Sequence, residues 1–213
     1  MGKIDRNTGL WYELTRLAST DRIGTKEVNA VPEVQLRKIK GVYDWYRLYR
    51  LYREAFPASE RKPFAIIARM YRQGKTDLWC VTKDGGFAGM AATINGEDLI
   101  LLDYFAVVRS LRGQGVGSEA MALLQEQYRD KGLFAEIEST RRAVPDLHQR
   151  QKRKQFYLDA GMRDLGTEAN VFGVNMELIG SRCELDYDGY RAFYGENYGV
   201  WAADHITRPE QEE

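Results

Sequence analysis

A glycine-rich run between a hydrophobic segment and an amphipathic segment constrains the fold of this chain more than any other feature. It is the stretch Arg112-Gly113-Gln114-Gly115-Val116-Gly117-Ser118. Residues 99–108 before it are short, β-branched and aromatic, which predicts a buried strand. After it, apolar or small residues recur at helical spacing, which predicts an amphipathic helix with Gly117, Ala120, Met121, Leu124 and Tyr128 on one face.

A glycine turn that opens a helix leaves several backbone N–H groups unpaired at the positive end of the helix dipole. Anions, and phosphate groups above all, are favoured at such a point. Glycine suits the turn because a Cβ would hold a phosphate away from the amides and because such turns need positive φ. Arg112 adds a cation at the mouth. The run therefore predicts a loop that binds a diphosphate.

Other interpretations of the same glycines compete. A Walker A loop is excluded, because Ser118 and Glu119 follow Gly117 where that motif needs Lys and then Ser or Thr. The dinucleotide fingerprint fits Gly115-x-Gly117-x-x-Ala120, with Glu136 or Glu138 near the place of a ribose-binding acid. However, residues 109–112 separate the strand from the loop, and no series of βαβ units precedes it. A plain strand-to-helix turn is the third alternative.

The spacing Arg-x-x-Gly-x-Gly after a strand resembles the acetyl-coenzyme A loop of the GNAT acyltransferase superfamily. A second segment, Phe156-Tyr157-Leu158-Asp159-Ala160-Gly161-Met162, resembles the GNAT segment in which a tyrosine stands four residues before a Gly-Phe pair, with Met162 in place of Phe. The resemblance implies acetyl-CoA as cofactor and Tyr157 as the acid that protonates the departing thiolate. It also implies that the cofactor is bound by Phe105, Ala106, Val107, Arg112, Gly113, Gln114, Gly115, Val116, Gly117 and Ser118.

The rest of the chain predicts the element order βααβββαβαββ from about Gln35 to Ile179, which matches the GNAT fold. This is an α/β (α+β) class with a mixed, mainly antiparallel sheet and flanking helices. Residues 77–83, 87–94 and 99–108 predict an antiparallel meander, and residues 162–165 with 170–178 predict a final hairpin. We expect an N-terminal appendage over 1–33, the acyltransferase domain over 34–180 and a Tyr-rich extension with an acidic tail over 181–213.

The acceptor amine must lose a proton before it attacks, so a base is needed. Glu136 and Glu138 alternate with Ala135 and Ile137, which places both carboxylates on one face of a strand. Both are candidate bases, although acids on a solvated strand face would give the same pattern. Asp103, which interrupts an apolar strand, ranks third, as a base or as a buried acid with a hydrogen-bond partner.

Composition limits the partners. Lys plus Arg equals Asp plus Glu at 31 each, which argues against a nucleic-acid partner, although residues 1–75 carry 16 basic and 8 acidic residues. Two cysteines and two histidines predict neither a disulfide framework nor a metal site. No signal peptide or membrane-spanning run is visible, so the cytoplasm is expected. A homo-oligomer is compatible with the Tyr-rich extension.

These observations predict an acetyl-CoA-dependent N-acetyltransferase that transfers an acetyl group to a primary amine of a small molecule or peptide, by direct attack in a ternary complex. Two alternatives are open. One is a non-catalytic module that binds acyl-CoA or a protein. The other is an NAD-dependent oxidoreductase.

Overall fold

The computed structural model describes residues 33–209. The expected N-terminal appendage lies outside them apart from Glu33, as does the acidic end of the tail at 210–213. The helices are α2 (Gly41–Ala55), α3 (Phe64–Arg72), α4 (Val116–Gln127), α5 (Leu147–Asp159), α6 (Tyr187–Tyr198) and α7 (Val200–Asp204), with short 3-10 turns at Ala58–Glu60 and Arg109–Leu111. None of the helices in this part of the chain is long and apolar enough to cross a membrane.

The strands form one sheet with the order β1-β2-β3-β4-β5-β7-β6-β8. Their bounds are β1 (Val34–Lys38), β2 (Thr76–Lys83), β3 (Gly86–Asn95), β4 (Leu99–Val107), β5 (Gly132–Glu138), β6 (Arg163–Val171), β7 (Val174–Ser181) and β8 (Ile206–Thr207). All neighbours are antiparallel except β4 and β5. The predicted meander is confirmed as β2-β3-β4, and so is the predicted order of elements from β1 to β7.

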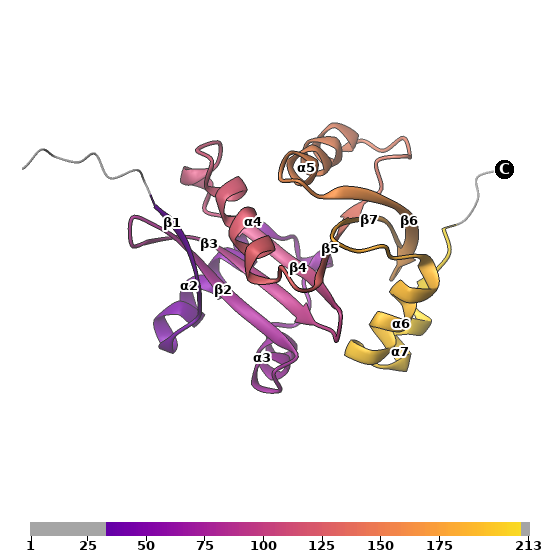
Figure 1. The fold of residues 1–213 in the computed structure, drawn as a ribbon, viewed down its shortest axis with the longest axis horizontal. Helices are drawn as coiled ribbons and strands as arrows, with labels where there is room; N and C mark the ends of the chain where they lie inside the picture. Colours follow the sequence, from indigo (N-terminus) through magenta and orange to yellow (C-terminus); the bar gives the residue numbers. More distant parts are fainter. Residues whose placement is uncertain (1–32, 210–213) are drawn as a thin grey trace, which may run out of the picture. The chain divides into compact units, whose positions relative to one another are not determined.

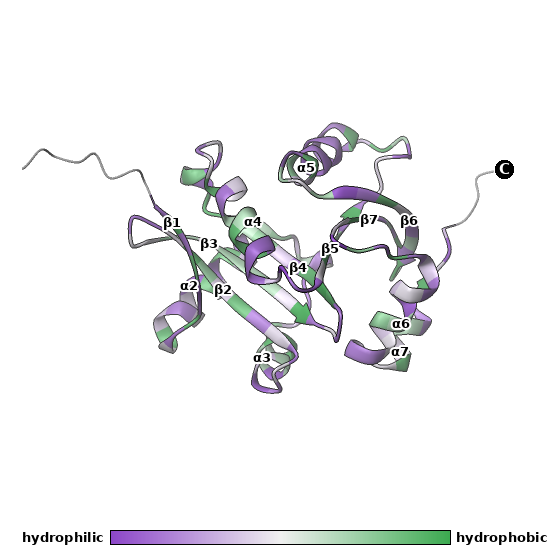
Figure 2. Ribbon diagram, viewed as in Figure 1, coloured by the Kyte–Doolittle hydropathy of each residue, from purple (hydrophilic) through white to green (hydrophobic). Residues whose placement is uncertain are grey.

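Helices cover both faces of this sheet, because the strands bury apolar side chains on both sides. Helices α4 and α5 share one core with Leu102 of β4 and Ala135 of β5. Helices α2 and α3 pack with Ala92 of β3 on the opposite face, and α6 packs with Ile94 of the same strand. Since Ala92 and Ile94 are two residues apart, α2, α3 and α6 lie on one face. Figure 2 shows that the middle strands are mostly hydrophobic, whereas the helices carry both hydrophilic and hydrophobic residues.

The final hairpin turns later than predicted. Its turn is Phe172-Gly173, with φ of 50° and 90°, which matches a two-residue hairpin turn whose central residues both have positive φ. Residues 166–169, which the sequence predicts to be the turn, lie within β6 and form part of a bulge. There, Asp164 pairs with Ile179 and Glu168 with Glu177, so β6 has extra residues opposite β7. Gly166, at φ 72°, allows this bulge and gives the same sequence signal as a turn.

The segment after β7 is part of the folded body. Asp186 caps α6 by accepting a hydrogen bond from the Gly189 amide at 2.8 Å. Phe193 of α6 packs edge-on against Phe134 of β5 with ring centroids 5.1 Å apart. Strand β8 then pairs with β6 and becomes the eighth strand of the sheet. Helix α6 therefore lies beside β5, the strand that follows the glycine-loop helix (Figure 1).

Candidate active site

Strands β4 and β5 separate halfway along their length. Their parallel pairing ends at Leu102 opposite Ala135. Beyond that point β4 stays paired with β3, while β5 stays paired with β7. Asp103 is an extra residue in β4, since Ala92 faces Tyr104 and Thr93 faces Leu102, and such a bulge bends the strand that carries it. The result is a wedge between two strands of one sheet, with α4 over β4 and α5 over β5 (Figure 1).

The edge of β4 that borders this wedge offers backbone hydrogen-bonding groups. The Val108 amide donates to the Ala88 carbonyl of β3 at 2.8 Å, so by alternation Val107 and Phe105 direct their backbone groups away from β3. The side chain of Arg112 confirms this direction, because its Nε donates to the Val107 carbonyl at 3.0 Å. Of the three β4 residues predicted to bind the cofactor, Phe105 and Val107 therefore face the wedge with their backbones, whereas Ala106 faces β3.

The glycine loop is at the same end of β4. Gly113 and Gly115 have φ of 75° and 80°, and α4 begins directly after Gly115. The first amide inside the helix that finds a helical acceptor is that of Glu119, which donates to the Gly115 carbonyl at 3.0 Å. The amides of residues 116–118 in the first turn have no such acceptor. Gly117 has a further reason to be glycine, because a Cβ there would lie 3.2 Å from the ring of Phe156 on α5.

We expect Gly115→Ala to weaken CoA binding by about tenfold or more, the worth of one charge-assisted hydrogen bond. An L-residue at φ 80° is strained, so the turn would shift and redirect the amides that follow it. Isothermal titration calorimetry with CoA measures the effect. Gly74→Ala is the matched control, because Gly74 after α3 has φ 72° and open space around it. Equal CoA affinity of the two folded variants would contradict the role of the loop.

Glu136 is the first residue of β5 beyond the last pair with β4, at the apex of the wedge. Its Oε1 accepts hydrogen bonds from the hydroxyls of Tyr190 at 2.7 Å and Tyr194 at 2.8 Å, both on α6. Burial raises the pKa of Glu136, while the Lys62 ammonium and the tyrosine hydroxyls oppose that rise. The pKa values of both tyrosines lie well above their usual range, so they stay protonated donors. Both tyrosines bind Oε1, which leaves Oε2 for another partner.

Asp103 is the residue of β4 that corresponds to Glu136, one position past the last pair. Its side chain is only 8% exposed and forms an ion pair with the Lys62 ammonium, at 2.6 Å. The same ammonium donates to the Tyr198 hydroxyl at 2.8 Å and lies 4.3 Å from the centre of that ring. Of the two interpretations of Asp103, the structure confirms a buried acid with a partner. The wedge apex thus holds two carboxylates with one ammonium close to both.

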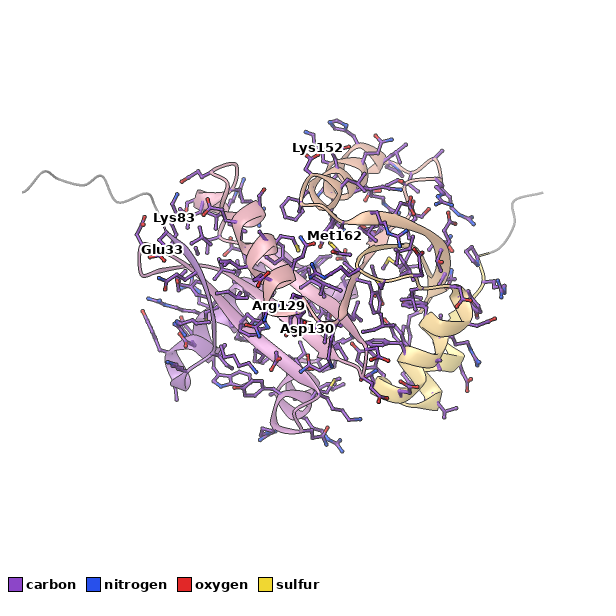
Figure 3. The ribbon with its side chains drawn as sticks, viewed as in Figure 1. Glu33, Lys83, Arg129, Asp130, Lys152 and Met162 are labelled. Carbon is purple, nitrogen blue, oxygen red and sulfur yellow. The ribbon has the colours of Figure 1, made fainter. Side chains whose placement is uncertain are left out.

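Glu138 lies on the same strand face but has different neighbours. Its two carboxylate oxygens pair with Arg150 at 3.1 Å and with Arg153 at 3.0 Å, both on α5. Two guanidinium groups therefore occupy both oxygens of this carboxylate. Lys152, by contrast, points away from the body on the outer side of α5 (Figure 3). The arginines of α5 thus tie this helix to β5.

Tyr157 lies on the inner face of α5, 9% exposed, in the core shared with β5 and α4. Burial raises the pKa of Tyr157 to about 12, and the nearby Arg153 opposes the rise. No other side chain or backbone group within residues 33–209 makes a hydrogen bond to its hydroxyl. Met162, which follows Gly161 at the end of α5, is buried between that helix and the sheet (Figure 3). Its apolar side chain therefore fits this position.

Four residues at the apex escaped prediction from the sequence, namely Lys62, Tyr190, Tyr194 and Tyr198. The tyrosines recur at intervals of four on α6, which places them on one helix face, so their spacing was a usable signal. Lys62 carries no such signal. It comes from the segment between the 3-10 turn and α3, where the Tyr104 hydroxyl accepts from its amide at 3.1 Å and the Tyr52 hydroxyl donates to its carbonyl at 2.9 Å.

Comparison with known proteins identifies the family to which this fold, with its wedge and its glycine loop, belongs. Residues 45–152 match the acetyltransferase (GNAT) family model. Since the match covers half of the chain, the chain belongs to the GNAT acetyltransferase family. No curated protein sequence matches it. The mainly antiparallel sheet also differs from the parallel sheet of dinucleotide-binding domains.

Several solved structures share this fold. A protein from Bacteroides thetaiotaomicron, described as a GNAT-family acetyltransferase, is 20% identical with a TM-score of 0.63, over 78% of this chain and 99% of that one. Spermidine N-acetyltransferase from Vibrio cholerae, solved with CoA and spermine, is 9% identical with a TM-score of 0.56, over 70% and 94%. An aminoglycoside 6′-N-acetyltransferase solved with coenzyme A is 13% identical with a TM-score of 0.57, over 69% and 96%. At these identities the likeness shows the fold.

Proposed function

We propose that this protein is an N-acetyltransferase that uses acetyl-CoA and acetylates a primary amine of a small molecule or peptide. The observation that carries the proposal is the wedge itself. The wedge combines the unpaired amides in the first turn of α4, the edge of β4 that no longer pairs with β5 and a carboxylate with a raised pKa at its apex. A ligand that carries a diphosphate and an arm with amide groups fits these features. The helix amides can bind the diphosphate, and the edge of β4 can form hydrogen bonds with the amides of the arm.

The acceptor side of the wedge favours a cationic amine. Glu136 and Asp103 supply two negative charges against the one positive charge of Lys62. The ring of Tyr198 already lies 4.3 Å from the Lys62 ammonium, so the apex accommodates a cation beside an aromatic ring. The structural relatives named for spermidine and for aminoglycosides act on amines of this kind. A primary ammonium group therefore suits the apex of the wedge better than a neutral or anionic acceptor.

The residues can divide the chemistry among them. Acetyl-CoA supplies a thioester whose carbonyl carbon is open to attack by an amine. The Val107 amide faces the wedge and can polarise the carbonyl oxygen, as an oxyanion donor does. Glu136, through Oε2, accepts the proton of the acceptor ammonium, and its raised pKa brings it closer to that task than an exposed glutamate. Tyr157 donates a proton to the thiolate that leaves. Glu138 is the weaker candidate base, because two arginines already bind it.

Ligand binding followed by turnover tests the proposal. We expect acetyl-CoA and CoA to raise the melting temperature of the protein, since a ligand that binds only the folded state stabilises it, and NAD to leave it unchanged. A panel of polyamines, aminoglycosides, amino acids and peptides with acetyl-CoA should then yield a product heavier by one acetyl group in mass spectrometry. Stabilisation by NAD alone would support an oxidoreductase. Stabilisation by CoA without turnover of any amine would support a non-catalytic binding module.

A further inference from the structure

Helix α2 has an exposed face of tyrosine and arginine that acyl transfer does not use. Its inner side is fixed to the body by Leu48, Leu51 and Tyr52, all buried. On its outer side three tyrosines are exposed by 63%, 54% and 37% of their surface, and Val42 by 85%. We call this outer surface the α2 face, and it consists of Val42, Tyr43, Tyr46, Arg47, Tyr49, Arg50, Arg53 and Glu54.

Each arginine of the α2 face lies against the tyrosine one turn earlier. The guanidinium-to-ring distances are 4.1 Å for Arg47 over Tyr43, 5.8 Å for Arg50 over Tyr46 and 5.8 Å for Arg53 over Tyr49. Residues at this spacing are neighbours on a helix, so the three pairs follow one another along the axis. Arg47 and Arg53 each also donate one N–H to the hydroxyl of the paired tyrosine, at 2.9 Å and 3.4 Å, which holds these guanidinium groups in place and leaves their other N–H groups for an anion.

The α2 face is positive because its acids are few and one is turned inward. Within residues 33–209, Arg47, Arg50 and Arg53 form no ion pair with a carboxylate. Asp44 of the same helix is buried and bound to Arg37 at 2.6 Å, which leaves Glu54 as the acid of this face. The wider segment 41–75 has eight basic and three acidic residues. The zero net charge of the chain therefore conceals a local excess of positive charge.

We propose that the α2 face binds single-stranded RNA. Proteins that hold single strands combine cations that follow the phosphates with aromatic rings on which bases stack, and this face repeats that pair three times. Acidic peptides would need the arginines alone and would leave the three rings without a function. The contacts between tyrosine and arginine do support the helix by a few tenths of a kcal/mol per pair. Support of the helix, however, does not require the tyrosine rings to be exposed.

Fluorescence anisotropy of a labelled oligouridylate with the full chain tests this inference without acetyl-CoA. We expect binding that weakens as salt rises. The variant R47Q/R50Q/R53Q should bind about tenfold or more weakly, and the slope of log K against log salt should fall by about 2, as expected for three lost contacts to a single strand. The variant Y43L/Y46L/Y49L keeps the charge and should lose about fivefold or more for each base that no longer stacks.

The matched control is R129Q/K152Q/R208Q, which removes the same charge from sites near the end of α4, on α5 and after β8 (Figure 3 labels the first two). Circular dichroism checks that each variant is folded. Absence of binding by the wild type at low salt overturns the inference, as does an equal loss in the control. If polyglutamate competes as well as RNA and the leucine variant is unchanged, the partner is an acidic protein instead. Each result leaves the proposed acetyl transfer untouched, because it is measured separately.

Discussion

Replacing Glu136 with Gln is expected to lower the rate of acetyl transfer by about 100-fold or more while leaving CoA affinity unchanged. General-base catalysis contributes at least that much in most enzymes that use it. The substitution preserves structure well, because the amide oxygen of glutamine can still accept hydrogen bonds from Tyr190 and Tyr194. What is lost is the capacity to take a proton, together with the negative charge that favours a cationic acceptor, so the rates are compared at saturating amine. Initial rates with an amine found in the acceptor panel measure the effect.

The pH dependence distinguishes a base from a structural acid. A carboxylate can act as base only above its own pKa, so the wild-type rate should fall as pH drops through the pKa of Glu136, which burial raises. The rate of the Glu136→Gln variant should lack this acidic limb and should instead rise with pH as the acceptor amine loses its proton. Its deficit is therefore largest at low pH and shrinks as pH rises. A deficit that stays constant across pH would assign Glu136 to structure.

Two further variants sharpen this result. Tyr194→Phe removes one hydrogen bond to the charged form of Glu136, which raises the pKa further, so the acidic limb should move to higher pH. Glu138→Gln removes the partner of Arg150 and Arg153 and should cost stability more than rate. If Glu138→Gln instead abolishes the acidic limb, the two carboxylates have exchanged roles.

Much of the fold could be predicted because its signals are local. The positive φ of Gly113 and Gly115, the helical spacing after them and the hairpin glycines each act within a few residues. Gly166 shows the limit of such signals, since a glycine with positive φ serves a bulge as readily as a turn. Only the pairing of β6 with β7 decides between them, and that pairing is not local.

The apex of the wedge shows the same limit for the site. Strand alternation and resemblance led to Glu136 and Tyr157 as candidates, and their catalytic roles stay predictions. The environment of Glu136, however, comes from Lys62 and α6, which lie 74 residues before it and about 55 residues after it in the sequence. No spacing rule connects such distant segments. Packing of α6 against β5 brings its tyrosines to the carboxylate, and this packing depends on the whole sheet.

Tyr157→Phe is expected to keep the fold and CoA affinity but to lower turnover by about 100-fold. The ring stays, so contacts in the core shared by α5, β5 and α4 barely change. The hydroxyl makes no hydrogen bond to any other group within residues 33–209, so its removal leaves no partner unsatisfied there. If Tyr157 only fills the core, the Tyr157→Phe substitution should therefore change the rate little.

The raised pKa of Tyr157, about 12, defines which proton transfer this residue can perform. At neutral pH the Tyr157 hydroxyl is protonated throughout, so it can donate to a thiolate, whereas it could not serve as a base. The loss in Tyr157→Phe should be partial, because solvent can also protonate the thiolate. It should shrink with acyl donors whose thiols are more acidic, since these leave without help. Single-turnover rates with such donors measure the trend, and CoA titration provides the binding control. A wild-type rate in the variant, with the chemical step shown to limit turnover, would remove Tyr157 from the mechanism and leave solvent as the proton donor.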